Sequence, residues 1–95
     1  MTDLQCAATA VLLAAGAGRP AWLARLPVAA WFDLPDERDA AGFLEETADR
    51  FRGETFVLTA SAETLTRALR ARGMQGPAPV AVEIDASGWH LVDHP

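Results

Sequence analysis

The residue types best suited to chemistry lie close to the C-terminus, in a segment that reads EIDASGWHLVDH. We expect Asp85 and His90 to face each other across a hairpin, where the carboxylate would favour the charged imidazolium. The pair could act as a general acid and base, or it could bind zinc together with Glu83. His94 would lie about 13 Å from His90 along the strand, too far to share a metal ion. The more ordinary interpretation is a solvated cross-strand pair, which needs neither activity nor metal.

A second pattern is the run VLLAAGAGR at residues 11–19. This run resembles the phosphate-binding opening of the sugar-nucleotide and molybdopterin nucleotidyltransferases, in which a strand leads into a glycine loop. The resemblance implies a loop whose backbone N–H groups hold nucleotide phosphates. It spans nine residues, and the lysine that follows the loop in those families has no counterpart because the chain contains no lysine. The alternative is a helix that ends at these glycines, and no cofactor is expected.

Charge and cysteine usage exclude some partners. The 95 residues include thirteen acids and eight basic residues, all arginines, for a net charge of −5. Nucleic-acid binders usually carry a basic excess, so we expect no nucleic-acid partner. The one local cluster, Arg67, Arg70 and Arg72, has Glu63 one helical turn before it, as on a solvated helix face. The single cysteine, Cys6, cannot form an intrachain disulfide and fits a cytoplasmic location.

The apolar stretch at residues 7–17 raises the question of a membrane or targeting segment. It is about half as long as the ~20 residues that a helix needs to cross a bilayer. Residues 15–17 resemble a signal-peptidase site, but the segment before them carries Asp3 and no positive charge. We therefore expect this stretch to belong to the fold, with no membrane association.

The elements that must position these side chains centre on a βαβ unit. Residues 36–52 place apolar side chains at the i, i+3, i+4 and i+7 spacing of a helix. Asp36 marks its beginning and Gly53 follows its end. Short apolar runs at 28–34 and 54–60 flank the helix and predict two parallel strands.

Further elements precede and follow this unit. Residues 20–26 predict a short helix, and Ser61 is expected to cap another that ends before Gly73. The last part predicts a hairpin in which Ile84 pairs with Leu91, because that register gathers the apolar side chains on one face. The side chains expected on this face are those of Val80, Val82, Ile84, Trp89 and Leu91.

The N-terminal segment allows two interpretations. Its alanine content and apolar spacing from Leu4 to Ala15 favour a helix. The alternative is a strand over 10–15 followed by a glycine loop. The helix would be apolar nearly all round and would have to be enclosed, for which so short a chain offers little surface. A partner chain would supply the missing cover.

These expectations combine into one α/β (or α+β) domain over residues 1–95, with a small mixed sheet of about four strands and the element order α-β-α-β-α-β-β. The expected function is a small non-enzymatic interaction or accessory domain, which acts as a homodimer or beside a larger protein. The alternative is a small enzyme or metal-dependent module that uses the Asp85/His90 face. The expected interface residues are Leu4, Val11, Leu12, Leu13, Trp22 and Trp31.

Overall fold

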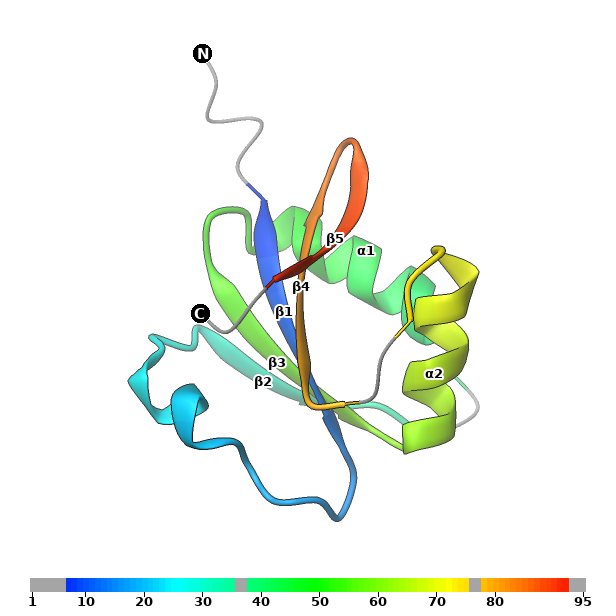
Figure 1. Ribbon diagram of the computed structural model, residues 1–95. Coiled ribbons are helices and arrows are strands. Elements are labelled where there is room, and N and C mark those ends of the chain that lie inside the picture. Colours follow the sequence, from blue (N-terminus) through cyan, green and yellow to red (C-terminus); the bar gives the residue numbers. More distant parts are fainter. Residues whose placement is uncertain (1–6, 36–37, 76–77, 93–95) are drawn as a thin grey trace.

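A computed structural model describes residues 7–35, 38–75 and 78–92, which form a five-stranded sheet with two α-helices on it (Figure 1). The strands are β1 (Ala8–Ala14), β2 (Ala30–Asp33), β3 (Thr55–Ala60), β4 (Val80–Asp85) and β5 (Gly88–Val92). The α-helices are α1 (Ala40–Arg50) and α2 (Ala62–Ala71), and a short 3₁₀ helix, η2, covers Ala21–Arg25.

The strand order is β2-β3-β1-β4-β5, which places the first strand of the chain in the middle of the sheet (Figure 1). β1 runs parallel to β3, and β3 runs parallel to β2. The hairpin of β4 and β5 is antiparallel, and β4 pairs with β1. Leu12 thus pairs with Leu58 on one side and with Val80 on the other. The central strand joins the βαβ half of the sheet to the hairpin half.

The N-terminal segment is a strand, so the predicted N-terminal helix is wrong and the alternative of a strand followed by a glycine loop is confirmed. The physical reason is that β1 is buried on both faces, and such a strand is a continuous apolar run without alternation. Periodicity alone cannot distinguish a run of this kind from a buried helix. Pairing with β3 and β4 outweighs the weak helix preference of alanine. The sheet therefore gains a fifth strand, and the order of elements begins with β1.

The remaining predicted elements exist, with adjusted ends. The two parallel strands and the helix between them are confirmed as β2, β3 and α1. Ser61 caps α2 as expected, because its Oγ accepts a hydrogen bond from the Thr64 N–H at 3.1 Å. The short helix expected at residues 20–26 is η2. In the part of the chain that is described, no helix has the length and apolar character needed to cross a bilayer.

The hairpin has the predicted faces but not the predicted register. Ile84 pairs with Trp89 rather than with Leu91, and Asp85 pairs with Gly88 rather than with His90. The turn is tighter than expected, because Gly88 takes a φ of 127° that few other residues adopt. A shift of two residues leaves every side chain on its original face, so burial could not distinguish the two registers.

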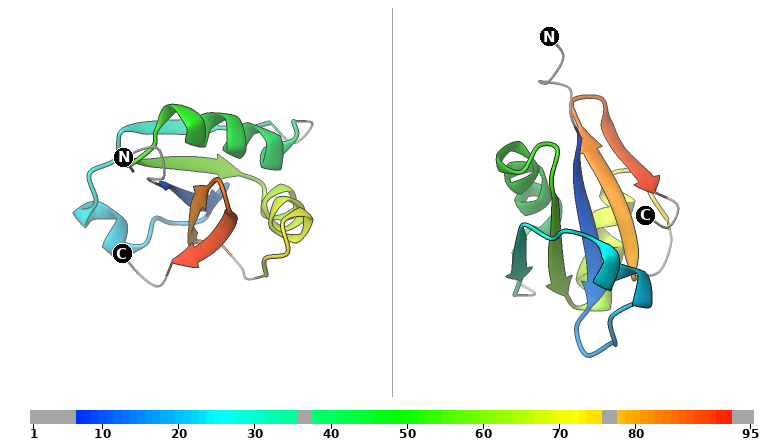
Figure 2. Two further views of the ribbon diagram at one scale, coloured as in Figure 1. Left: turned by 90° about the horizontal axis from the view of Figure 1, so that it is seen from above. Right: turned by 90° about the vertical axis from the view of Figure 1, so that its left-hand side faces the viewer.

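The two faces of the sheet are covered unequally. The larger core lies under α1 and α2 and includes Leu12, Leu44 and Phe56, all fully buried. The opposite face carries a smaller core, in which Val11, Leu13 and other strand residues pack against Leu23 of η2. Figure 2 shows η2 and the α-helices on different sides of the sheet. Leu23 is the one buried residue of η2, so its cover of this face is thin.

Aromatic packing fixes the edge strand β2. The Phe32 ring packs edge-on against Phe43 of α1, with 5.5 Å between the ring centroids, and against Phe56 of β3 at 6.0 Å. Because side chains alternate along a strand, anchoring Phe32 under α1 directs Trp31 to the opposite face. Trp31 therefore lies on the thinly covered side, next to η2.

Candidate functional site

The predicted chemical cluster comes together at the hairpin turn, with one more member than expected. Asp85 Oδ1 accepts hydrogen bonds from the Ser87 N–H at 2.8 Å and from the Ser87 Oγ–H at 2.7 Å. His90 Nε2 lies 3.2 Å from Ser87 Oγ and 3.7 Å from Asp85 Oδ1. In a hydrolytic triad the imidazole stands between hydroxyl and carboxylate. Here the carboxylate contacts the hydroxyl directly, so the cluster closes the turn and does not have the order of such a triad.

The electrostatics of Asp85 agree with this structural role. The hydrogen bond from the Ser87 hydroxyl, followed by that from the Ser87 backbone, lowers the pKa of the Asp85 carboxyl below its ordinary value. A carboxyl held in its ionised form at neutral pH cannot donate a proton there. Asp85 is thus a hydrogen-bond acceptor for the turn.

The metal candidates do not form a coordination site. Glu83, rather than Asp85, is paired with His90 across the hairpin. Within residues 7–35, 38–75 and 78–92, no three side chains of His, Cys, Asp or Glu gather closely enough to hold a metal ion. His94 and Cys6 lie outside the described residues.

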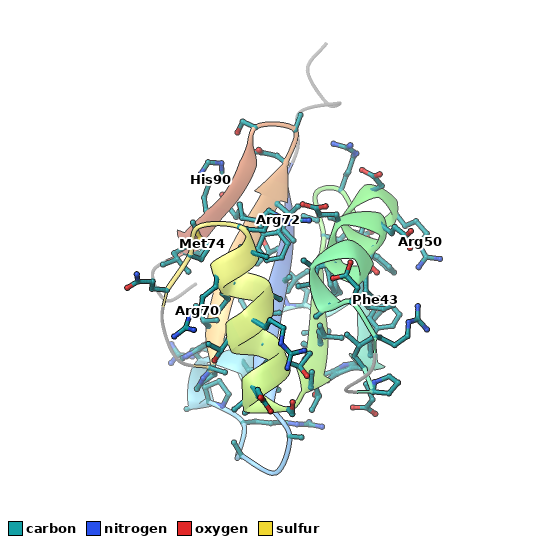
Figure 3. All side chains as sticks on the ribbon, turned by 90° about the vertical axis from the view of Figure 1, so that its right-hand side faces the viewer. Phe43, Arg50, Arg70, Arg72, Met74 and His90 are labelled. Atoms are coloured by element: carbon teal, nitrogen blue, oxygen red, sulfur yellow. The ribbon has the colours of Figure 1, made fainter. Side chains whose placement is uncertain are left out.

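A second polar cluster joins both α-helices to the hairpin (Figure 3). Arg72, just after α2, donates to Glu45 of α1 through Nε at 2.6 Å and through Nη2 at 2.9 Å. The Trp89 indole N–H of β5 donates to the same carboxylate at 3.1 Å. These contacts, above all that of Arg72, lower the pKa of Glu45. A cleft of about 320 Å³ lies beside this cluster, but its Glu45 is already engaged by two donors.

The glycine loop matches the nucleotidyltransferase resemblance in its first half only. A strand does precede it, and Gly16 turns the chain with a φ of 85°. The loop then leads into η2, a 3₁₀ helix of five residues, and not into the N-terminus of a long helix. The backbone donors and the dipole that hold phosphates in such sites come largely from that helix. A Cβ at Gly16 or Gly18 would meet nothing within 4 Å, so neither glycine is needed for a close approach inside this chain.

The expected interface residues fall into two groups. Val11, Leu12 and Leu13 are 0%, 0% and 5% exposed, because the two sheet neighbours and the cover on both faces enclose β1. They offer no surface to a partner, and the expectation that this segment needs a companion chain is corrected accordingly. Leu4 lies outside the described residues, and Trp22 packs half-buried against the smaller core.

Trp31 differs from the rest of that set. Its side chain is 48% exposed, and among the described residues only Leu91 is a comparably exposed large apolar residue. Next to Trp31 is a cleft of about 410 Å³ between η2 and β2, which we call the Trp31 cleft. Its lining consists of Arg19, Pro20, Ala21, Leu23, Ala24, Leu26, Val28 and Trp31.

Arg19 gives the Trp31 cleft a cationic edge. Its guanidinium carbon lies 4.4 Å from the centroid of the Trp31 ring, within the range of a cation–π contact. From the sequence, Arg19 was expected only as the end of the glycine loop, and Leu23 and Leu26 were not expected in a site. These residues come together because the chain after β1 crosses the open face of the sheet to reach β2. No local sequence pattern predicts this crossing.

Comparisons with known proteins add no relative: no family model, no curated protein and no solved structure matches the chain.

Proposed function

We propose that this protein is a small interaction or accessory domain that binds a segment of a larger protein at the Trp31 cleft. The observation that carries the proposal is an exposed tryptophan on an edge strand beside an apolar cleft. The N-terminal segment does not contribute to this surface, because β1 is enclosed by its own chain.

The residue types in the cleft favour protein recognition. Tryptophan and arginine are the residues most often found at the energetic centres of protein interfaces. A half-exposed Trp31 leaves apolar ring surface in water, and covering such surface favours association, offset in part by the entropy lost when the partners are ordered. The aliphatic lining from Leu23, Leu26 and Val28 continues this apolar surface.

The strand that carries Trp31 also offers backbone groups. In the described part of the chain β2 pairs with β3 and with no strand on its other side. An open strand edge can accept an extended segment of another chain as an additional strand. A segment docked there would cover the Trp31 ring at the same time, so backbone pairing and side-chain burial would act together.

The test compares two equally exposed apolar residues. The protein is isolated from its own cells through an affinity tag, as wild type, Trp31→Ala and Leu91→Ala. We expect the wild type and the Leu91→Ala variant to retain one partner at constant stoichiometry, and Trp31→Ala to lose it. Native mass spectrometry gives the composition, and circular dichroism verifies that each variant is folded.

Two outcomes contradict the proposal. One is a partner retained equally by wild type and Trp31→Ala. The other is a wild type that remains a monomer at every concentration tested and retains no partner.

A further inference from the structure

We infer that the segment bound at the Trp31 cleft is extended and acidic, with apolar side chains alternating with carboxylates, one of which pairs with Arg19. This inference rests on the proposed function of the same surface and specifies the chemistry of the partner. Three features of the structure lead to it: the local charge, the geometry of Arg19 and the position of Asp33.

The charge around the Trp31 cleft is opposite in sign to that of the whole chain. The chain has a net charge of −5, yet residues 4–32 contain two arginines, Arg19 and Arg25, and no acid. On the helical side of the molecule Arg52 pairs with Asp49 and Arg72 pairs with Glu45. Arg19 and Arg25 form no ion pair with any residue that the structure describes. The lining of the cleft itself holds one charged side chain, that of Arg19, and no acid, so it attracts negative charge.

The geometry of Arg19 suits a carboxylate. The guanidinium carbon lies over the Trp31 ring, and the planar guanidinium carries five N–H donors that form no ion pair with a described residue. A carboxylate can receive two parallel hydrogen bonds from a guanidinium. Stacking also limits the rotamers of Arg19 before a ligand arrives, which reduces the entropy lost on binding. The aromatic ring and the guanidinium thus form one preformed site for an acid flanked by apolar groups.

Asp33 restricts where the acid can lie. It is exposed and follows Trp31 by two residues, on the same face of β2. A second carboxylate placed opposite Asp33 would be repelled, whereas one placed opposite Arg19 is attracted. Arg19 and Asp33 together determine where along the strand edge the acid of the bound segment lies, namely near Arg19.

The probes are three capped nonapeptides in which valine alternates with glutamate, glutamine or lysine. Binding to the wild type and the arginine variants is followed by NMR through the indole N–H resonance of Trp31, assigned by its absence in Trp31→Ala. Binding to Trp31→Ala is followed through backbone amide resonances. We expect the glutamate peptide to bind about fivefold to tenfold more tightly than the glutamine peptide, the range for a partly exposed charged hydrogen bond. The lysine peptide should bind most weakly, and the preference for glutamate should shrink as salt is added.

Two arginine variants test whether the preference for the glutamate peptide depends on Arg19. Arg19→Gln should make the glutamate and glutamine peptides bind equally, since the charge that distinguishes them is removed. Arg70→Gln, on the outer face of α2, removes the same charge away from the cleft and should leave the preference unchanged. This control separates a contact with Arg19 from a general effect of net charge.

The outcomes distinguish the two proposals. Equal binding of the glutamate and glutamine peptides to the wild type, with both lost in Trp31→Ala, overturns the acidic segment and leaves the interaction domain intact. Failure of all three peptides to bind overturns the extended segment itself. A dimer of this chain that Trp31→Ala dissociates would show a second copy in the cleft and would overturn both proposals.

Discussion

Glu45 on α1 and Arg72 after α2 form a two-point ion pair, with Nε 2.6 Å from Oε2 and Nη2 2.9 Å from Oε1. The guanidinium also lies 5.7 Å from the centroid of the Trp89 ring, whose N–H donates to the same carboxylate. One acid therefore connects both helices to β5, and these contacts account for its lowered pKa.

Replacing Glu45 by Gln should remove a pH dependence of stability. Since the folded-state pKa of Glu45 is lowered, its contribution is present above the ordinary glutamate value of about 4.3 and is lost as the pH falls through the lower folded value. When Glu45 is protonated, we expect the free energy of unfolding of the wild type to fall by about 0.5–1 kcal/mol, as for a partly exposed ion pair. Urea unfolding at pH 7 and pH 3 measures this difference. Glu46→Gln serves as the exposed control, and parallel pH profiles for wild type and Glu45→Gln would contradict the prediction.

Replacing Ser61 by Ala should destabilise the N-terminus of α2. Ser61 Oγ accepts the hydrogen bond of the Thr64 N–H in the first turn of α2, where backbone N–H groups depend on such caps. Loss of such a cap costs about 1 kcal/mol. Ser61→Asp retains an acceptor and should stay close to the wild type in urea unfolding. Equal losses in both variants would show that the cap is not the cause.

Replacing Gly88 by Ala should strain the hairpin. The φ of 127° at Gly88 is a conformation that residues with a Cβ rarely adopt, although the space around it is open. The backbone strain predicts a loss of about 1–3 kcal/mol. Gly18→Ala provides the matched control, because its surroundings are equally open and its φ is not in that region. Thermal unfolding that lowers the midpoint of both variants alike would refute this explanation.

Truncating Leu12 should test whether β1 is core rather than interface. Leu12 is fully buried between β3 and β4, so Leu12→Ala should cost about 2–5 kcal/mol in unfolding free energy. Leu91→Ala removes an equally large side chain that is 48% exposed, and it should cost less than about 1 kcal/mol. Chemical denaturation at two protein concentrations measures both. If the loss of unfolding free energy in Leu12→Ala varied with protein concentration, Leu12 would instead lie at an interface between chains.

The sequence predicted elements whose two faces differ in polarity, and it also predicted β3, which is buried on both faces, from a short apolar run directly after the α1 pattern. The apolar stripe of α1 and the alternation in β4 and β5 each distinguish an inner face from an outer one, and both were found. β1 has no outer face, so its sequence lacked the contrast that would have separated strand from helix. The hairpin register failed for a related reason, because Ile84 keeps its face in both registers.

The candidate site was harder to predict from the sequence than the fold. Asp85 and His90 were expected together, and they do lie near each other at the hairpin turn, but Ser87 intervenes and the pairing across the strands is with Glu83. Trp31 was expected at an interface because an N-terminal helix was expected to need a partner chain as cover. The structure removes that reason, since β1 is covered within its own chain. The Trp31 cleft depends on a crossing between β1 and β2 that only the folded chain creates.

The central position of β1 determines the order in which the sheet can be completed. The first strand leaves the ribosome before either neighbour, since β3 begins at Thr55 and β4 at Val80. Until β3 and β4 have been synthesised, the unpaired edges of β1 remain open to any other strand. Pairings this distant in sequence also form slowly. During synthesis the chain therefore exposes an apolar strand that the folded molecule encloses on both faces.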